Sequence, residues 1–220
     1  MRERFERGLV RLGLRLQDQA IEEELLYQKE LLRWNKRINL TSIRDVGEAQ
    51  EKHLLDSLLL LNHVVGGDVL LDVGSGGGLP GIPVAIAERG LQLVSVDSVG
   101  KKINFQKHIK RKLQLDNVQV EHCRVEELES RGFSRESFDV VVTRAFSSLE
   151  TIFNLTAGWV APGGKMIAMK GAEAADEMTQ LEVHLNDYGF SDLKIFHYQL
   201  PFSRAERNII IARKDLSHQQ

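Results

Sequence analysis

A glycine-rich segment that directly follows a short apolar run constrains the fold of this chain more than any other feature of its sequence. Leu70–Val73 has the length and composition of a buried strand. The residues after it, 74–81, are rich in glycine, which suits a turn whose backbone angles exclude a Cβ and a loop that a ligand approaches closely. Pro80 suits the first turn of a helix, where its missing N–H costs nothing. The segment therefore predicts a strand, a tight turn and a helix.

Short apolar runs alternate with helix-length polar segments from residue 68 onward. The strand candidates are Val69–Val73, Leu93–Val96, Val118–His122, Phe138–Thr143, Lys165–Met169, Leu193–Tyr198 and Asn208–Ala212. The helix candidates between them are Pro80–Arg89, Lys101–Leu113, Leu149–Trp159 and Glu173–Tyr188. This alternation is typical of an α/β doubly wound fold with a mostly parallel sheet. The last two strands lack an intervening helix, which predicts an antiparallel hairpin at one edge of a seven-stranded sheet.

The first 65 residues have the pattern of a helical extension. Apolar residues such as Ile21, Leu25 and Leu32 recur at the 3.6-residue period. Asp18 is the expected N-cap of this helix, and Asp45 followed by Glu48 is a variant of the capping box for a second one. We therefore expect an extension over residues 1–65 and a main domain over 66–220. A length of 220 residues suits one compact unit of this kind.

Composition excludes several classes of protein. The 29 basic and 31 acidic residues give a net charge of −2, which argues against binding nucleic acid by bulk charge but allows local basic patches. The single cysteine, Cys123, cannot form an internal disulfide, and we expect it to be a small buried residue in a reducing cytoplasm. We identify no zinc-site spacing, no signal peptide and no apolar stretch approaching the ~18 residues of a membrane span.

The glycine-rich segment also satisfies a dinucleotide-binding pattern. Gly76, Gly78 and Gly81 match G-x-G-x-x-G, a weak signal when taken alone. Asp97 lies about 20 residues further on, at the end of the next predicted strand, where an acid binds a ribose diol. Enzymes that use NAD and enzymes that use S-adenosylmethionine share this arrangement, because both cofactors contain adenosine. A loop with only a structural role is the alternative.

Asp72 favours S-adenosylmethionine over NAD. It lies two residues before Gly74, at the tip of the predicted strand, so that the pattern reads D-x-G-x-G-x-G. A carboxylate there suits the cationic methionine end of that cofactor and would repel a pyrophosphate. We also find no histidine–carboxylate constellation for hydride transfer.

Beyond these patterns, the sequence resembles a known family. The segments that carry the resemblance are DVGSGGGLPGIP (72–83), WNKRINLTSIRD (34–45), HLLDSL (53–58), VDSVGKKINF (96–105), RVEEL (124–128), TRAFSSL (143–149), MKG (169–171) and ERNIII (206–211). They are similar to the bacterial ribosomal RNA small subunit methyltransferase G family, also called glucose-inhibited division protein B, over about residues 20 to 214. That family methylates N7 of a guanine in 16S ribosomal RNA with S-adenosylmethionine. The resemblance implies the Rossmann-like class I methyltransferase fold.

The resemblance also implies roles for individual residues. It places Gly74 and Leu79 in contact with the cofactor, Gly76 and Gly78 in shaping the loop, and Asp97 on the ribose hydroxyls. It places Val125 and Glu126 next to the adenine and Arg144 in the cofactor site. Without the resemblance, Glu126 reads as a solvated acid in a loop.

The expected chemistry requires little from the protein. Guanine N7 carries a lone pair and no proton, so no general base is needed, and positioning can supply most of the catalysis. The N/D-P-P-Y/F motif of amine methyltransferases is absent after the fourth predicted strand, where Thr143–Phe146 stands instead. We therefore nominate no catalytic acid, base or metal ligand. Arg144 and Phe146 are positioning candidates, although Phe146 can equally be a core residue.

The expected partner is 16S ribosomal RNA or the 30S particle, bound by a monomer. The candidate RNA-binding residues are Lys36, Arg37, Arg44, Lys101, Lys102, Lys170, Arg204 and Arg207. Each can instead belong to a solvated helix face. His53 and Asp56, one helical turn apart, read as a structural polar pair. Two other functions stay open on the residues alone: a small-molecule methyltransferase, and a non-catalytic cofactor-binding factor associated with the ribosome.

Overall fold

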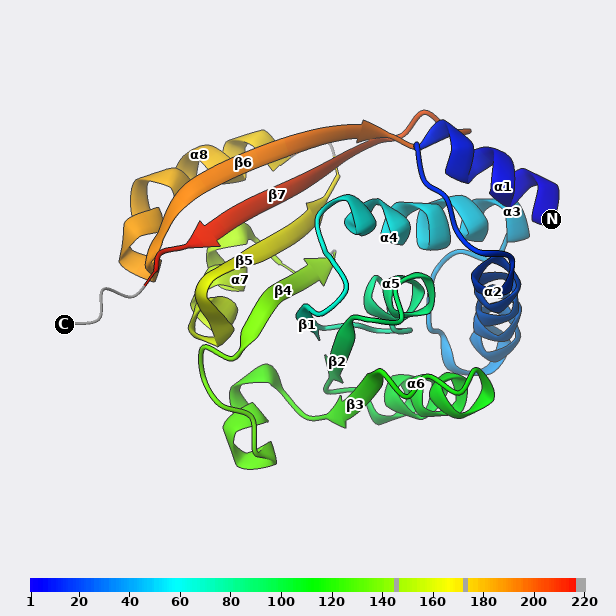
Figure 1. Ribbon diagram of the computed structural model, residues 1–220, viewed down its shortest axis with the longest axis horizontal. Coiled ribbons are helices and arrows are strands. Elements are labelled where there is room, and N and C mark those ends of the chain that lie inside the picture. The colour runs from blue at the N-terminus through cyan, green and yellow to red at the C-terminus, as the bar shows by residue number, and fades with distance from the viewer. Residues whose placement is uncertain (145–146, 172–173, 217–220) are drawn as a thin grey trace.

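The computed structural model describes residues 1–144, 147–171 and 174–216, which form helical layers around one seven-stranded sheet (Figure 1). The strands are β1 (Val69–Val73), β2 (Gln92–Asp97), β3 (Val118–His122), β4 (Phe138–Arg144), β5 (Val160–Lys170), β6 (Phe190–Gln199) and β7 (Glu206–Lys214). Their spatial order is β3-β2-β1-β4-β5-β7-β6. The predicted mostly parallel sheet is confirmed.

Strand pairing also confirms the antiparallel hairpin at one edge. β1 pairs in parallel with β2 and β4, whereas β7 runs antiparallel between β5 and β6. β5 begins at Val160, five residues before the predicted start at Lys165. Val160 pairs with Phe138, and the register shifts after this pair. The Pro162-Gly163-Gly164 sequence interrupts the apolar pattern, so the sequence does not predict this first part of the strand.

Helices cover both faces of the sheet, and each face has its own apolar core. α5 (Gly81–Ala87) and α6 (Gly100–Lys112) lie on one face, and α7 (Leu149–Thr156) and α8 (Ala174–His184) lie on the other (Figure 1). A 3-10 segment follows β3 at Val125–Arg131. The sheet is therefore buried on both sides, as the continuous apolar strands predict.

The first 62 residues are mostly helical. They form α1 (Arg2–Arg11), α2 (Asp18–Ile38), α3 (Val46–Ala49), a π-helical turn (Gln50–Leu55), α4 (Asp56–Leu58) and a 3-10 turn (Leu59–Asn62). The expected cap at Asp45 is confirmed, because its carboxylate accepts a hydrogen bond from the backbone N–H of Glu48 at 2.8 Å. The cap expected at Asp18 is wrong. Gln17 is the N-cap residue, and the Asp18 carboxylate pairs with Arg2 of α1 instead.

α2 forms an additional layer outside α5 and α6 (Figure 1). Phe5, Tyr27 and Leu31 of the N-terminal helices are fully buried in the same apolar cluster as Ile82 and Phe105 of the main domain. Because of this shared core, the N-terminal helices can position residues around the glycine-rich loop.

Because Glu24 of α2 is buried, we expect it to make the stability of the folded protein depend on pH. It is fully buried, and neither carboxylate oxygen has a hydrogen-bond partner in the described part of the chain. Burial raises the pKa of Glu24 well above its usual value, and the charge of Glu23 adds to the effect. The folded state therefore retains a proton that the unfolded chain loses above about pH 4.3, and stability falls as pH rises through the folded-state pKa.

We expect Glu24→Gln to flatten the pH dependence of the free energy of unfolding. When the pH is raised from 5 to 8, the free energy of unfolding should fall less in Glu24→Gln than in wild type, by on the order of 1 kcal/mol or more. The reason is that the amide cannot ionise. Urea denaturation across this range measures it. Glu3→Gln, at an exposed acid of α1, is the control. Parallel pH profiles for wild type and Glu24→Gln would contradict the interpretation.

Candidate cofactor-binding and active site

The candidate site lies at the carboxyl ends of β1, β2 and β4. The strand order reverses around β1, since β2 is its neighbour on one side and β4 on the other. Ligands of open α/β sheets bind outside the carboxyl ends of the strands at such a switch point. The glycine-rich loop follows β1 at this edge, Asp97 ends β2 and Arg144 ends β4.

The loop needs glycine for its backbone conformation. Gly74, Gly76 and Gly78 have φ of +70°, +59° and +88°, in the left-handed region that side chains disfavour. At Gly76 a Cβ would meet nothing within 4 Å, whereas at Gly78 it would lie 2.3 Å from Cδ1 of Ile82. Gly76 therefore leaves open space beside the main chain, and Gly78 permits close packing of the loop on α5.

Two residues that the sequence reasoning missed fix the loop from the protein side. The buried Gln106 amide of α6 donates to Ser75 Oγ at 2.8 Å and to the Gly76 carbonyl at 2.9 Å. The Tyr27 hydroxyl of α2 donates to the Gly77 carbonyl at 2.8 Å. A polar residue on the apolar face of α6 is a sequence signal for Gln106. No local signal identifies Tyr27.

Asp97 ends β2, the position that the sequence predicts for it, and its carboxylate contacts the loop. Its Oδ2 accepts a hydrogen bond from the Gly76 N–H at 2.8 Å, and its Oδ1 accepts one from the Val99 N–H at 2.8 Å. Lys102 Nζ lies 3.7 Å from Oδ2. The carboxylate is thus held rigidly beside the open space at Gly76.

Asp72 ties β1 to the start of α5. It is fully buried, and its Oδ2 accepts a hydrogen bond from the Gly81 N–H at 2.9 Å. Its Oδ1 has no hydrogen-bond partner among the described residues. Burial raises the pKa of Asp72 to about 7, against the lowering effects of the Gly81 N–H and the Arg144 charge. A cation bound nearby would favour the ionised form.

Three further cofactor candidates, Leu79, Val125 and Glu126, lie around this edge. Leu79 is buried within the loop, in the core on the α5 side of the sheet. Val125 is buried on the opposite side and begins the 3-10 segment after β3. Its neighbour Glu126 is exposed.

Arg144 is oriented by the N-terminal helices. Its Nη1 donates to the Lys52 carbonyl at 3.1 Å and lies 3.4 Å from Asp56 Oδ2. Asp56 Oδ1 lies 3.2 Å from Nε of Arg207, at the start of β7. Burial raises the pKa of Asp56, and the two guanidinium groups oppose that shift. One buried carboxylate therefore holds two arginines from different strands.

The expected polar pair between His53 and Asp56 does not form. His53 Nε2 instead shares a hydrogen bond with Thr41 Oγ1 at 2.8 Å. The physical reason is the π-helical turn over Gln50–Leu55, whose wider ring moves residues three apart out of alignment. Burial lowers the pKa of His53 to about 4, and the charge of Arg144 contributes. His53 is therefore neutral at physiological pH.

The candidate RNA-binding residues divide into exposed and paired groups. The exposed ones are Lys36, Arg37, Arg44, Lys101 and Arg204. Lys102 pairs with Asp97 and Arg207 with Asp56. Lys170 pairs with Glu177 at 2.9 Å and donates to the Ser147 carbonyl, with 12% of its side chain exposed. Phe146 lies outside the described residues.

Other features of the sequence can also be located. Cys123 is buried and unpaired, directly after β3. Within the described ranges, no group of three or more His, Cys, Asp and Glu side chains is arranged to hold a metal ion. None of the described helices is long and apolar enough to cross a membrane.

These residues fit S-adenosylmethionine. Gly76 offers open space beside the main chain, and the fixed Asp97 carboxylate lies next to it. The unpaired oxygen of buried Asp72 provides a hydrogen-bond acceptor near the same loop, and its ionised form can balance a positive charge. An adenosine ribose and a cationic methionine group are the two features of the cofactor that this donor set suits.

Comparison with known proteins agrees with this geometry. The family model described as "rRNA small subunit methyltransferase G" matches residues 20–210. Ribosomal RNA small subunit methyltransferase G of Syntrophotalea carbinolica is 41% identical over 97% of this chain and 98% of its own length.

Two solved structures share the fold at low identity. A SAM-dependent methyltransferase from Aquifex aeolicus has a TM-score of 0.56 with 14% identity, covering 76% of this chain and 92% of that one. M. jannaschii TYW2, solved in complex with AdoMet, has a TM-score of 0.57 with 11% identity, covering 72% and 73%. The chain therefore belongs to the rRNA small subunit methyltransferase G family and is an S-adenosylmethionine-dependent methyltransferase with a Rossmann-like fold.

Proposed function

We propose that this chain transfers a methyl group from S-adenosylmethionine to N7 of one guanine in 16S ribosomal RNA. The observation that carries this proposal is the match to small-subunit rRNA methyltransferases over nearly the whole chain, the N-terminal helices included. Independently of the match, the glycine loop and Asp97 support a cofactor that contains adenosine, and Asp72 favours S-adenosylmethionine among such cofactors.

Chemistry at guanine N7 agrees with the side chains at the site. When bound, S-adenosylmethionine supplies an electrophilic methyl group on a sulfonium. N7 presents a lone pair and no proton, so the protein needs to align the reactants and need not remove a proton. His53 is neutral and buried, and it takes no part as a base. Arg144, held beside Asp56 at the end of β4, belongs to the cofactor site and also orients the base or a phosphate beside it.

Each cofactor contact has a proposed residue. Asp97 binds the ribose hydroxyls, and the main chain at Gly74 and Leu79 lies against the cofactor. Gly76 and Gly78 give the loop its shape. Val125 and Glu126 flank the adenine beyond β3. Asp72 balances the positive charge of the methionine end, directly or through the loop.

The setting of the reaction follows from the substrate. We propose that the protein acts as a monomer in the cytoplasm on 16S RNA or on the 30S particle. We also propose that residues 1–65 and 66–220 fold as one unit. The apolar core that they share supports this proposal.

The decisive experiment is methyl transfer with labelled S-adenosylmethionine to deproteinised 16S RNA and, in parallel, to 30S subunits. We expect label in one 7-methylguanosine, located by borohydride and aniline cleavage of the RNA. Asp97→Ala should raise the Kd for S-adenosylmethionine about 10- to 100-fold, the effect of losing hydrogen bonds to a charged group. Asp116→Ala removes an exposed acid elsewhere and is the control.

Other results would overturn the proposal. Label in another base, at another guanine atom or only in a small molecule would exclude guanine-N7 methylation of RNA. An activity that salt leaves unchanged would favour a small-molecule substrate, since RNA binding weakens with salt.

A further inference from the structure

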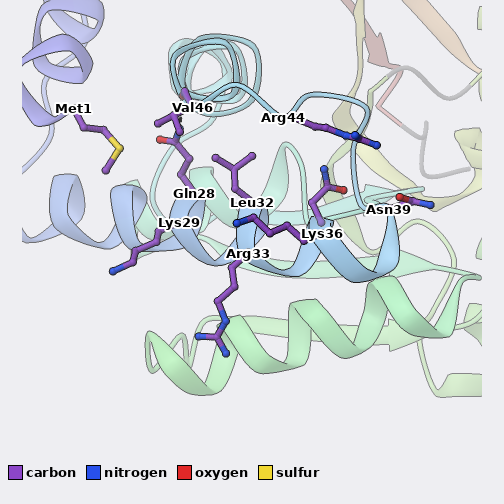
Figure 2. A pocket seen from close by; sticks show the side chains of 10 residues that line it. Met1, Gln28, Lys29, Leu32, Arg33, Lys36, Asn39, Arg44 and Val46 are labelled. Atoms are coloured by element: carbon purple, nitrogen blue, oxygen red, sulfur yellow. Dashed lines mark hydrogen bonds between the residues drawn. The ribbon is translucent and has the colours of Figure 1, made fainter.

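We propose that a groove along α2 binds an unpaired segment of the substrate RNA next to the methyl-accepting nucleotide. This inference rests on the proposed function for the identity of the polymer. The groove has a volume of about 850 Å³ and lies between α2, the N-terminus of α1 and the 39–46 segment. Figure 2 shows its side chains along α2, with Met1 at one end and Asn39 and Arg44 at the other.

The charge of the groove is uniformly positive. Its lining includes Lys29, Arg33, Lys36 and Arg44 and no carboxylate. Lys29, Lys36 and Arg44 have no ion pair within the described part of the chain. Arg33 lies 3.4 Å from Glu30, with 68% of its side chain exposed. Unpaired cations at a concave surface are available to phosphate groups.

Apolar side chains accompany these cations. Leu32 lies in the groove and belongs to neither apolar core of the sheet. Val46 and Met1 are 46% and 60% exposed. Proteins bind single-stranded RNA through cations for the phosphates and flat or apolar surfaces for unstacked bases. A duplex hides its bases from such a surface, so the occupant that fits is an unpaired strand.

A second hollow extends the positive surface. It has a volume of about 310 Å³ and shares Arg33 and Lys36 with the groove. Trp34, Arg37 and Ile38 complete its wall. The positive surface thus continues around the C-terminal half of α2, so that it can bind more than one phosphate of an RNA strand.

Helix-end electrostatics explain only part of this pattern. Lys36 and Arg37 lie in the last turn of α2, where cations stabilise the helix dipole. Lys29 lies mid-helix and Arg44 lies beyond the helix, so neither gains this stabilisation. Their convergence on one groove suits an anionic ligand.

The groove lies close to the glycine loop. The opposite face of α2 carries Tyr27, whose hydroxyl binds the Gly77 carbonyl. One helix therefore separates the groove from the loop, a distance of about 10–12 Å. RNA in the groove is near enough to present a neighbouring nucleotide to the active site.

Hydrogen bonds connect the outer wall of the groove to Arg144. Asn35 of α2 accepts from the Thr41 N–H at 2.9 Å and donates to the Ile43 carbonyl at 3.3 Å. Thr41 Oγ1 shares a hydrogen bond with His53 Nε2. The residue before His53 is Lys52, and its carbonyl accepts a hydrogen bond from Arg144. The outer wall, formed by the 39–46 segment, is therefore fixed and connected to the mouth of the active site.

The test compares two variants of equal charge. The groove variant is Lys29→Gln, Lys36→Gln and Arg44→Gln combined. The control combines Arg7→Gln, Arg15→Gln and Arg111→Gln, exposed cations that line neither hollow. Binding to 16S RNA and to a 12-nucleotide single-stranded RNA is measured by fluorescence anisotropy at several salt concentrations, together with the Kd for S-adenosylmethionine.

We expect the groove variant to lose RNA affinity about 10- to 100-fold at physiological salt. The slope of log K against log salt should fall by about 2, or ~0.7 for each lost phosphate contact with a single strand. The Kd for S-adenosylmethionine should be unchanged. Leu32→Glu, which places a carboxylate in the groove, should weaken RNA binding on its own.

Several outcomes would overturn the inference. The first is equal RNA affinity for the two triple variants. The second is a duplex RNA that competes for binding as strongly as single-stranded RNA does. The third is loss of S-adenosylmethionine binding in the groove variant. RNA binding is measured without turnover. A wild type that binds RNA through the groove but methylates no guanine would refute the proposed function alone.

Discussion

Gly78→Ala should raise the Kd for S-adenosylmethionine by about 100-fold or more and reduce methyl transfer accordingly. At φ +88° an alanine is strained by about 1–2 kcal/mol. Its Cβ would also lie 2.3 Å from Cδ1 and 2.7 Å from Cγ1 of Ile82, so that the first turn of α5 must move. Overpacking of this kind costs about 1–3 kcal/mol. The loop relieves the strain by leaving the shape that the cofactor requires. Isothermal titration calorimetry measures the loss.

Gly132 provides a matched control. Its φ of +89° equals that of Gly78 within a degree, but a Cβ there would meet nothing within 4 Å. Gly132→Ala should lower stability slightly and leave the Kd unchanged. Adding Ile82→Ala to Gly78→Ala should restore part of the affinity by removing the clash. Wild-type affinity in Gly78→Ala, or a similar loss in Gly132→Ala, would contradict a steric requirement at the loop.

Asp56→Ala should reduce methyl transfer at least 100-fold and destabilise the protein by about 3–5 kcal/mol. The change removes the carboxylate that holds Arg144 and Arg207 at 3.4 Å and 3.2 Å. Their side chains are only 15% and 23% exposed, so water replaces that partner poorly. Breaking a buried ion pair by removing one partner has an effect of this size. Arg144 is then free to leave the end of β4, and the substrate loses its orientation.

Three measurements separate this positioning role from a loss of folding. Thermal denaturation reports the stability of Asp56→Ala, and assays are run well below its Tm. Asp56→Asn, which keeps the shape and one hydrogen-bond acceptor for the two arginines, should recover part of kcat. Asp68→Ala, at a half-buried acid far from Arg144 in sequence, is the control. A folded Asp56→Ala protein with wild-type kcat and KM for RNA would refute the positioning role.

The sequence determined the sheet and the glycine-rich loop because their signals are local. A buried strand, a glycine turn and a helix occupy consecutive residues, and their order fixes a parallel crossover. Asp97 ends the next strand, and parallel pairing of β1 with β2 brings it to Gly76. The hairpin of β6 and β7 was predictable for the same reason, since no helix separates its strands.

Only the tertiary structure decided how the N-terminal helices complete the site. Tyr27 reaches Gly77 across 50 positions, and Arg144 meets Lys52 and Asp56 across about 90. A local pattern cannot identify such partners, because packing between layers selects them. The π-helical turn shows the same limit over a short stretch of sequence. His53 lies in this turn and Asp56 directly follows it, yet each contacts a distant partner and not the other. The groove on α2 likewise depends on the path of the 39–46 segment, which Asn35 fixes and no periodicity reveals. Local periodicity thus specified the elements, whereas long-range contacts between buried polar groups specified the site.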